Sequence, residues 1–245
     1  MQKLKKIYRS EYNGENITVR SWWENNQWNY AQEKIDNAVI NNQTSKRAVV
    51  IGNGDSRKNY ELFLLKNHHA GPAGANAVQT YGCNALYRDF DPTFLVATGP
   101  IICQEIANSG FCHDRIVYAN AEIVAQYPGE FYLIPQDLHY NAGALAAYLA
   151  CFDGHEKVYL MGFDCGAGEN YNNNMYADTN GYAPINQNYS DELWVKTLVH
   201  VMETYNEVEF VRVMPTAGWY CPDAWRGLSN FRQITYREFV TEIDL

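Results

Sequence analysis

The sequence predicts an α/β fold in which a mostly parallel β-sheet is covered by helices on both faces. Two observations carry this prediction. From residue 47 onward, short apolar runs alternate with helical patterns, which is the order expected of strand–helix–strand units. The segment 141–151, NAGALAAYLAC, is almost wholly small or apolar, so a helix formed by it must be buried against the sheet.

The elements of this domain follow from local patterns. Short runs rich in apolar and β-branched residues predict strands at 47–52, 78–83, 93–97, 115–118, 130–134, 157–161 and 207–213. Helices are predicted between them at 57–66, 100–108, 121–126, 141–151 and 190–205. We therefore assign residues 46–245 to one α/β domain.

Residues 1–45 form a separate predicted unit, a small β-meander. Strand-like alternation extends over 7–33, with turns at Asn13-Gly14 and Asn25-Asn26. The unit carries tryptophans at positions 22, 23 and 28. These could pack on the main domain, which is the commoner use of such residues, or could mark a homo-oligomer contact.

Composition and charge exclude several classes of protein. The net charge of −9 disfavours a broad nucleic-acid surface. No apolar run reaches the roughly 18–20 residues needed to span a bilayer, and the basic start is not followed by the apolar stretch of a signal peptide. The six cysteines show no Cys-x-x-Cys spacing. We therefore expect a reduced, cytoplasmic protein.

Glycines and short polar residues follow the predicted strands. In an open α/β sheet, ligands bind beyond the carboxyl ends of the strands, where such residues offer amide contacts. Each alone also fits a turn or a helix cap, but together they predict one ligand site. The predicted site residues are Asn53, Gly54, Ser56, Asn84, Asn141, Gly143, Gly162, Phe163 and Asp164.

Residues 162–189 form a long loop that is rich in Gly, Asn and Tyr and lacks a regular period. A loop of this length in a compact domain is usually functional or disordered, and its tyrosines favour a lid over a ligand. Near the first strand, Arg57 is the only cation beside the glycine loop. It could hold a phosphate or could be a solvated residue, with equal weight.

Metal and acid–base signals are weak. Asp89-Phe90-Asp91 is the best metal candidate, since carboxylates suit Mg²⁺ or Mn²⁺, but it also fits a turn, so no metal is assigned. The histidines lack zinc-ligand spacing. His139 is the best-placed general base, whereas His155, in a Gly-His-Glu turn, is expected to be solvated.

Four motifs follow one another along the chain. They are Ile51-Gly52-Asn53-Gly54-x-Ser56, Cys83-Asn84-x-x-Tyr87, Asn141-Ala142-Gly143, and Val158 to Asp164 followed by the tyrosine-bearing loop. Taken in order, these motifs resemble the bacterial sialyltransferases of glycosyltransferase family 42 and the related motility-accessory-factor and pterin-diphosphokinase-like proteins. The resemblance covers about residues 47–215, and it implies a Rossmann-like fold and a nucleotide-activated sugar as ligand, with CMP-type nucleotides favoured.

The resemblance also implies roles for single residues. Asn53, Gly54 and Ser56 would lie under the phosphate and sugar, Asn84 near the phosphate, and Gly162, Phe163 and Asp164 at the base and ribose. Tyr171 and Tyr176 would stabilise the departing phosphate, which makes them catalytic candidates beside His139.

The sequence departs from the family pattern at two places. Asp55 stands where the family usually has proline, and the stretch 187–190 lacks the family's catalytic histidine. We therefore predict a nucleotide-sugar-dependent glycosyltransferase-like protein and keep two alternatives. One is an ATP-dependent diphosphokinase-like transferase that uses Mg²⁺ or Mn²⁺. The other is a non-catalytic binding or structural protein with the same fold.

Overall fold

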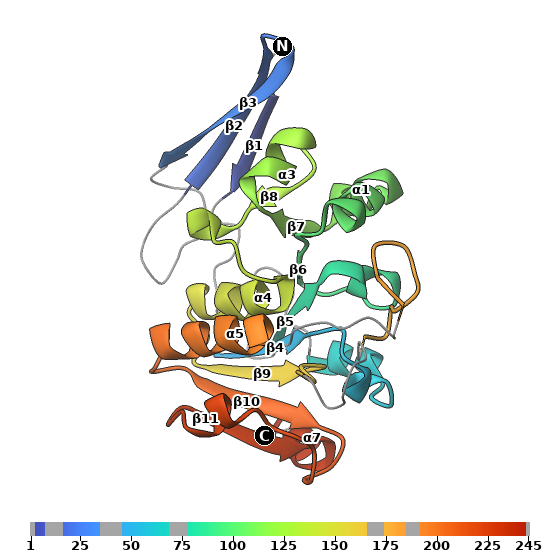
Figure 1. Cartoon of the computed structure of the whole chain (residues 1–245), viewed down its shortest axis with the longest axis vertical. Coiled ribbons are helices and arrows are strands. Elements are labelled where there is room, and N and C mark those ends of the chain that lie inside the picture. The colour runs from blue at the N-terminus through green and yellow to red at the C-terminus, as the bar shows by residue number, and fades with distance from the viewer. Residues whose placement is uncertain are drawn as a thin grey trace.

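The chain contains two separate β-sheets in the computed structural model (Figure 1). The structure describes residues 3–7, 17–34, 46–68, 78–165, 174–184 and 192–243. The smaller sheet is antiparallel and has the order β1 (Lys3–Ile7), β2 (Ile17–Glu24), β3 (Gln27–Lys34). A two-residue turn joins β2 and β3, because Asn25 and Asn26 adopt φ of 54° and 61°, as the Asn-Asn pair predicts. The predicted β-meander is therefore present.

One prediction for this unit falls on an undescribed part of the chain, since the Asn13-Gly14 turn lies outside the described residues. The first strand, β1, begins at Lys3, before the predicted position at residue 7. Trp22 and Trp23 lie on β2 and Trp28 on β3, but the structure describes only the backbone of these strands at those positions. Their role in a subunit contact stays a prediction.

The larger sheet has eight strands, all parallel, which confirms the predicted Rossmann-like α/β fold. Its order is β11-β10-β9-β4-β5-β6-β7-β8. The strands are β4 (Arg47–Ile51), β5 (Val78–Cys83), β6 (Phe94–Val96), β7 (Ile116–Ala119), β8 (Tyr132–Leu133), β9 (Lys157–Met161), β10 (Glu209–Met214) and β11 (Phe231–Thr235). All seven strands predicted for this domain are present.

The strand order reverses at β4. From β4 the chain adds β5 to β8 on one side, and it then returns to place β9 on the other side. The connections after β4 and β9 therefore lead to strands on opposite sides of this point, and a crevice is expected here at the carboxyl edge of the sheet.

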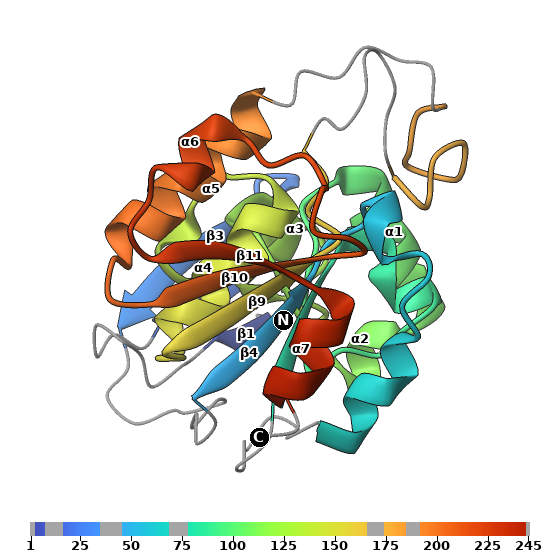
Figure 2. The same ribbon diagram turned by 90° about the horizontal axis from the view of Figure 1, so that it is seen from below.

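Helices cover both faces of the sheet (Figure 2). On one face lie α4 (Ala142–Phe152) and α5 (Glu192–Thr204), and on the other lies α7 (Tyr236–Ile243). Ten of the 11 residues of α4 are buried, which confirms that this small, apolar helix packs directly on the central strands. The remaining α-helices are α1 (Pro100–Ser109), α2 (Phe111–Asp114), α3 (Ala121–Gln126) and α6 (Asp223–Arg226).

The predicted helix at 57–66 is wrong. The structure has two 3₁₀ helices there, η1 (Asp55–Arg57) and η2 (Leu62–His68), separated by a break at 58–61. Two more 3₁₀ helices, η3 (Asn84–Arg88) and η4 (Pro135–Asp137), follow β5 and β8. The glycine loop after β4 thus leads into a single 3₁₀ turn and not into the N-terminus of an α-helix, so the loop does not itself supply the first turn of an α-helix.

Within the residues that the structure describes, no helix has the length and apolar character required to cross a membrane.

Candidate functional site

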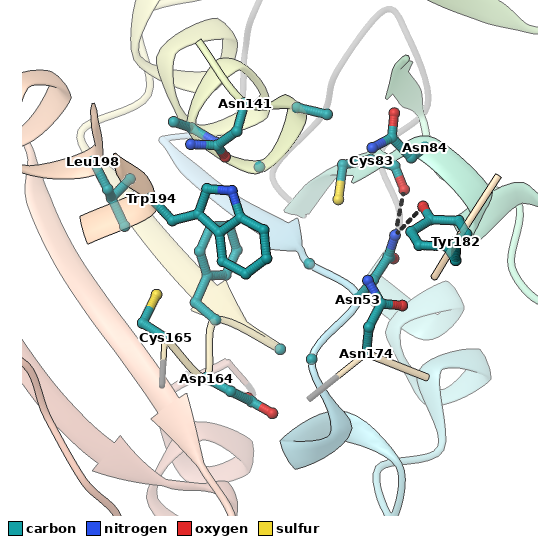
Figure 3. A pocket seen from close by; sticks show the side chains of 17 residues that line it. Asn53, Cys83, Asn84, Asn141, Asp164, Cys165, Asn174, Tyr182, Trp194 and Leu198 are labelled. Atoms are coloured by element: carbon teal, nitrogen blue, oxygen red, sulfur yellow. Dashed lines mark hydrogen bonds between the residues drawn. The ribbon is translucent and has the colours of Figure 1, made fainter. Parts of the chain in front are cut away.

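A pocket lies at the reversal point of the sheet (Figure 3). Its walls come from the ends of β4, β5 and β9, the first turn of α4, the segment 174–184 and the start of α5. Eight of the nine predicted ligand-binding residues line it: Asn53, Gly54, Asn84, Asn141, Gly143, Gly162, Phe163 and Asp164. The structure therefore brings together loops that are far apart in the sequence.

Other lining residues were not predicted from the sequence. Tyr182 comes from the long loop, and Trp194 and Leu198 come from α5. The thiols of Cys83 and Cys165 also line the pocket. The tyrosine-rich composition of the loop pointed to a tyrosine in the site, but nothing in the sequence distinguished position 182 from its neighbours.

Glycines allow the ends of β4 and β9 to touch. The Gly54 amide donates to the Gly162 carbonyl at 2.9 Å, and the Gly52 amide donates to the Met161 carbonyl at 2.8 Å. A β carbon at Gly52 would lie 2.5 Å from the Gly162 oxygen. Gly162 itself has φ +73°, a conformation that other L residues rarely adopt. The floor of the pocket is thus backbone in direct contact with backbone.

Asp164 fastens the glycine loop to the end of β9. Its Oδ2 accepts a hydrogen bond from the Ser56 amide at 2.9 Å, and its Oδ1 is shielded from solvent beside Gly54. Figure 3 shows the Asp164 side chain at the lower edge of the pocket. Burial raises the pKa of this carboxyl. Ser56, the one predicted ligand-binding residue that does not line the pocket, acts here through its amide.

Arg212, on β10, holds the loop that follows β9. The side chain is completely buried, and its Nε and Nη2 donate to the Phe163 and Asp164 carbonyls, both at 2.8 Å. Its Nη1 donates to the Tyr220 carbonyl at 2.5 Å and to the Gln233 Oε1 at 3.0 Å. Desolvation lowers the pKa of the guanidinium. The four acceptors fix the Arg212 side chain. Arg212 in turn positions the backbone of Phe163 and Asp164, which lines one side of the pocket.

Asn53 is oriented by two hydrogen bonds. Its Nδ2 donates to the Cys83 carbonyl at 3.2 Å and to the Tyr182 Oη at 3.1 Å, both drawn in Figure 3. The Ala85 amide also donates to the Tyr182 Oη, at 3.3 Å. Burial raises the pKa of Tyr182 to about 12, so its hydroxyl stays protonated at neutral pH. Tyr182 thereby joins the ends of β4 and β5.

The segment 174–184, which we call the docked segment, lies across the ends of β4 and β5. Asn174 forms a β-bridge with Gly54, and the Met175 amide donates to the Asn53 carbonyl at 2.8 Å. Arg88 donates to the Thr179 Oγ1 at 2.8 Å and to the Asn180 carbonyl at 2.9 Å. This part of the predicted lid is closed against the domain.

Glu105, on α1, also helps to hold the docked segment, because it binds both Arg88 and Asn180. It accepts hydrogen bonds from Arg88 at 2.7 Å and from Asn180, and these bonds lower its pKa to about 2. Because the folded-state pKa is depressed, the contribution of Glu105 to stability is present above its unfolded value and is lost as pH falls toward 2.

We expect Glu105→Gln to lower the stability of the protein at pH 7 and to flatten its loss between about pH 4.5 and 3. Urea unfolding at a series of pH values measures this, with Glu203→Gln, on the exposed face of α5, as the control. If the free energy of unfolding depends on pH equally in Glu105→Gln and in the unchanged protein, the Glu105 carboxylate does not stabilise the docked segment.

The two catalytic tyrosine candidates differ in position. Tyr171 lies outside the described residues. Tyr176 is buried and is not among the lining residues; its hydroxyl accepts from Arg57 Nη2 at 2.9 Å and donates to Asp89 Oδ2 at 2.6 Å. In this arrangement Tyr176 links the docked segment to the loops after β4 and β5, and its catalytic role stays a prediction.

Arg57 and Asp55 both have positions that the sequence left open. The Arg57 guanidinium is buried behind the glycine loop, where Nε donates to the Gly52 carbonyl at 2.7 Å, so it is not a solvated residue. Asp55 is exposed and does not line the pocket. The Asp55 carboxylate therefore adds no charge to the lining of the pocket.

The described lining contains no lysine or arginine. The sequence itself has none between Lys157 and Lys196, so the long loop cannot supply one. The polar groups around the cavity are asparagine amides, the Tyr182 hydroxyl, the Asp164 carboxyl and backbone amides. A ligand with several phosphates would meet no compensating charge from these residues.

The N-terminus of α4 offers amide donors at the pocket. Asn141 caps this helix, since its Oδ1 accepts from the Ala144 amide at 3.0 Å, and its Nδ2 donates to the Thr197 Oγ1 on α5 at 2.6 Å. The amides of a first helical turn have no acceptor within the helix, and they favour a single negative charge. Ala142 and Gly143, in this turn, line the pocket.

The remaining residues predicted for acid–base catalysis or metal binding do not line the pocket. Asp91 forms an ion pair with Arg115 at 2.6 Å, and Asp89 is bonded to Tyr176, so the two carboxylates have separate partners. In the described ranges, no group of three or more His, Cys, Asp or Glu side chains is arranged to hold a metal ion. His139 is exposed and outside the lining.

The expectation that His155 is solvated is wrong. Its side chain is buried, and its Nε2 lies 3.0 Å from the hydroxyl of Tyr81, which also donates to Asp153. These three side chains form a buried polar cluster between β5 and the end of α4. Within this turn the His155 side chain is thus covered by its partners, whereas the neighbouring Glu156 is exposed.

A scan of protein-family models gives no match to the chain, and a search of curated proteins finds no relative.

Proposed function

We propose that the protein is a nucleotide-sugar-dependent transferase that moves a sugar to an acceptor hydroxyl and binds the nucleotide in the pocket between β4 and β9. The observation that carries this proposal is the convergence of eight predicted ligand-binding residues on one pocket at the reversal point of a parallel sheet. The resemblance to glycosyltransferase family 42 supports it, because that resemblance rests on the same loops.

The charge of the lining favours a donor with one phosphate. A CMP-activated sugar carries a single phosphodiester charge, which the first-turn amides of α4 and the side chains of Asn84 and Asn141 could meet with neutral N–H groups. A triphosphate would require cations that the described lining lacks. We therefore favour CMP-type donors and no metal requirement.

In the proposed reaction, an acceptor hydroxyl oxygen forms a bond to the anomeric carbon of the sugar. The bond between that carbon and the phosphate oxygen breaks, and the electron pair leaves with the nucleotide as CMP. The acceptor proton passes to a base, for which His139 remains the sequence-based candidate, with Asp164 as the other acid–base group. Tyr171 and Tyr176 are the proposed donors to the departing phosphate.

The ATP-dependent diphosphokinase-like alternative has less support. It requires Mg²⁺ or Mn²⁺ beside a triphosphate. The weak metal candidates Asp89 and Asp91 are engaged by Tyr176 and Arg115, and Asp164 is turned to the Ser56 amide.

A thermal-shift series with CMP, CDP, UDP and ATP, each with and without Mg²⁺, tests the proposal. CMP at about 100 times its Kd should add about 2.7 kcal/mol of stability, which corresponds to a rise in Tm of roughly 5–10 °C for a chain of this size. We expect this rise without metal. A rise with ATP and Mg²⁺ alone would support the diphosphokinase-like reaction, and no rise with any nucleotide would contradict both.

A non-catalytic binding protein is the second candidate, because the described lining contains no histidine. Release of CMP from a CMP-activated sugar, followed over time, separates the two. Turnover supports the transferase, and nucleotide binding without turnover for any acceptor tried supports the binding protein.

We also propose a homo-oligomer formed through the N-terminal sheet, in the cytoplasm. Light scattering of the full chain across a concentration series measures its mass, and a constant monomer mass would contradict the oligomer.

A further inference from the structure

The pocket has two aromatic side chains on its apolar wall, and they differ in what they offer a ligand. Phe163 is 8% exposed, and its ring is packed on the first turn of α4, since a β carbon at Gly143 would lie 3.3 Å from its Cε1. Trp194 is only half-buried and lines the same cavity from α5. Phe163 thus mainly shapes the wall, and Trp194 is the more exposed of the two residues.

We propose that Trp194 is the platform on which the base of the nucleotide stacks. This inference rests on the proposed function, and it assigns the base to α5 in addition to the loop after β9. An indole face attracts flat rings, and stacking of a base on an aromatic side chain requires no particular base identity.

The two walls of the pocket suit a flat ring with a polar edge. Figure 3 shows the Trp194 indole reaching into the pocket with Leu198 beside it, and Asn53, Asn84 and Tyr182 on the opposite side. A base stacked on the indole would present its face to the apolar wall. Its hydrogen-bonding edge would then lie toward the amide and hydroxyl groups of the opposite wall.

The helix that carries Trp194 is held at two points. The Thr197 Oγ1 accepts a hydrogen bond from the Asn141 Nδ2 at 2.6 Å, and the carbonyl of Val195 accepts one from the Trp225 Nε1 at 3.2 Å. Leu198, one turn after Trp194, is buried in the core. A ring on a helix fixed in this way loses little freedom when a ligand stacks on it, which favours binding.

The test combines intrinsic fluorescence with equilibrium titration of CMP and cytidine on the full chain. We expect both ligands to quench the tryptophan emission of the unchanged protein, and ribose 5-phosphate, which lacks a base, to leave it unchanged. Trp194→Leu should weaken CMP binding roughly 5- to 150-fold, which is the range for removing one aromatic platform from one base. Trp194→Phe keeps a ring, so it should bind CMP within a few-fold of the unchanged protein and lose the quenching.

Trp219→Phe is the matched control, because Trp219 is outside the pocket and its loss should change neither affinity nor quenching. Equal CMP affinity in Trp194→Leu, or quenching that persists in Trp194→Phe, would overturn the inference while leaving the proposed function intact. Failure of the unchanged protein to bind CMP by calorimetry would instead overturn the proposed function. If Trp194→Leu does not fold, Trp194→Phe alone still decides the question.

Discussion

Replacing Gly54 with alanine is expected to destabilise the protein by about 2–4 kcal/mol and to abolish nucleotide binding. The new β carbon would lie 2.5 Å from the Asp164 Cγ and 2.6 Å from the Gly162 carbonyl oxygen. The second contact is with backbone, so no rotation of a side chain relieves it. The loops after β4 and β9 would have to separate, and they form the floor of the pocket.

Urea unfolding measures the loss of stability, and calorimetric titration of CMP measures the loss of binding. Gly99→Ala is the control, because Gly99 has a similar extended backbone, with φ −74° and ψ 125°, and its nearest atom to a new β carbon is 3.9 Å away. We expect little change in that variant. A Gly54→Ala protein as stable as Gly99→Ala would show that the two loops are not held in contact.

Replacing Arg212 with methionine is expected to cost about 3–5 kcal/mol in the free energy of unfolding. Methionine has a similar length, but it leaves the buried carbonyls of Phe163 and Asp164 without the donor that they have here, and it also removes the donor to the Tyr220 carbonyl. The guanidinium also lies over the Trp225 ring, 5.3 Å from its centroid. We expect the loop after β9 to shift, with weaker CMP binding even where the protein remains folded.

Arg226→Met is the control for the loss of an arginine. Arg226 is exposed and pairs with Asp223 three residues earlier on α6, so its removal should change stability by no more than about 0.5 kcal/mol. Chemical denaturation of both variants gives the comparison. Similar stabilities in Arg212→Met and Arg226→Met would mean that the buried hydrogen bonds of Arg212 do not hold the loop.

The strands of the large sheet could be predicted from the sequence because most are buried on both faces. Four of the five residues in β4 and in β9 are buried, and AVVI and VYLM are the continuous apolar runs that mark such strands. β11 was missed for the opposite reason. It is an edge strand with the sequence FRQIT, and only Ile234 is buried, so it has no apolar run.

The site could be predicted only where it follows the sheet. Residues at the ends of β4, β5 and β9 are placed by the strands before them, and a general rule of parallel sheets then brings them together. Tyr182 and Trp194 are placed by tertiary packing: the docked segment is held by Arg88 and Asn53, and α5 is held by Asn141. These contacts join positions that are far apart in the sequence, so no local sequence pattern predicts them.

The same reason explains why the sequence left the position of Arg57 open and gave the wrong position for His155. Arg57 and His155 have the local sequence of surface turns, yet both are buried because their partners come from distant elements, Tyr176 for Arg57 and Tyr81 for His155. A local pattern can predict a turn, but it cannot predict which face of the turn the fold covers.

The central claim is that the pocket at the reversal point of the sheet holds a nucleotide. A crystal structure of the protein soaked with CMP and without metal tests it most directly. We predict density for the base against Trp194 and for the phosphate near Asn84 and the first turn of α4. CMP bound at any other place, or no CMP at concentrations that shift Tm, would contradict the claim.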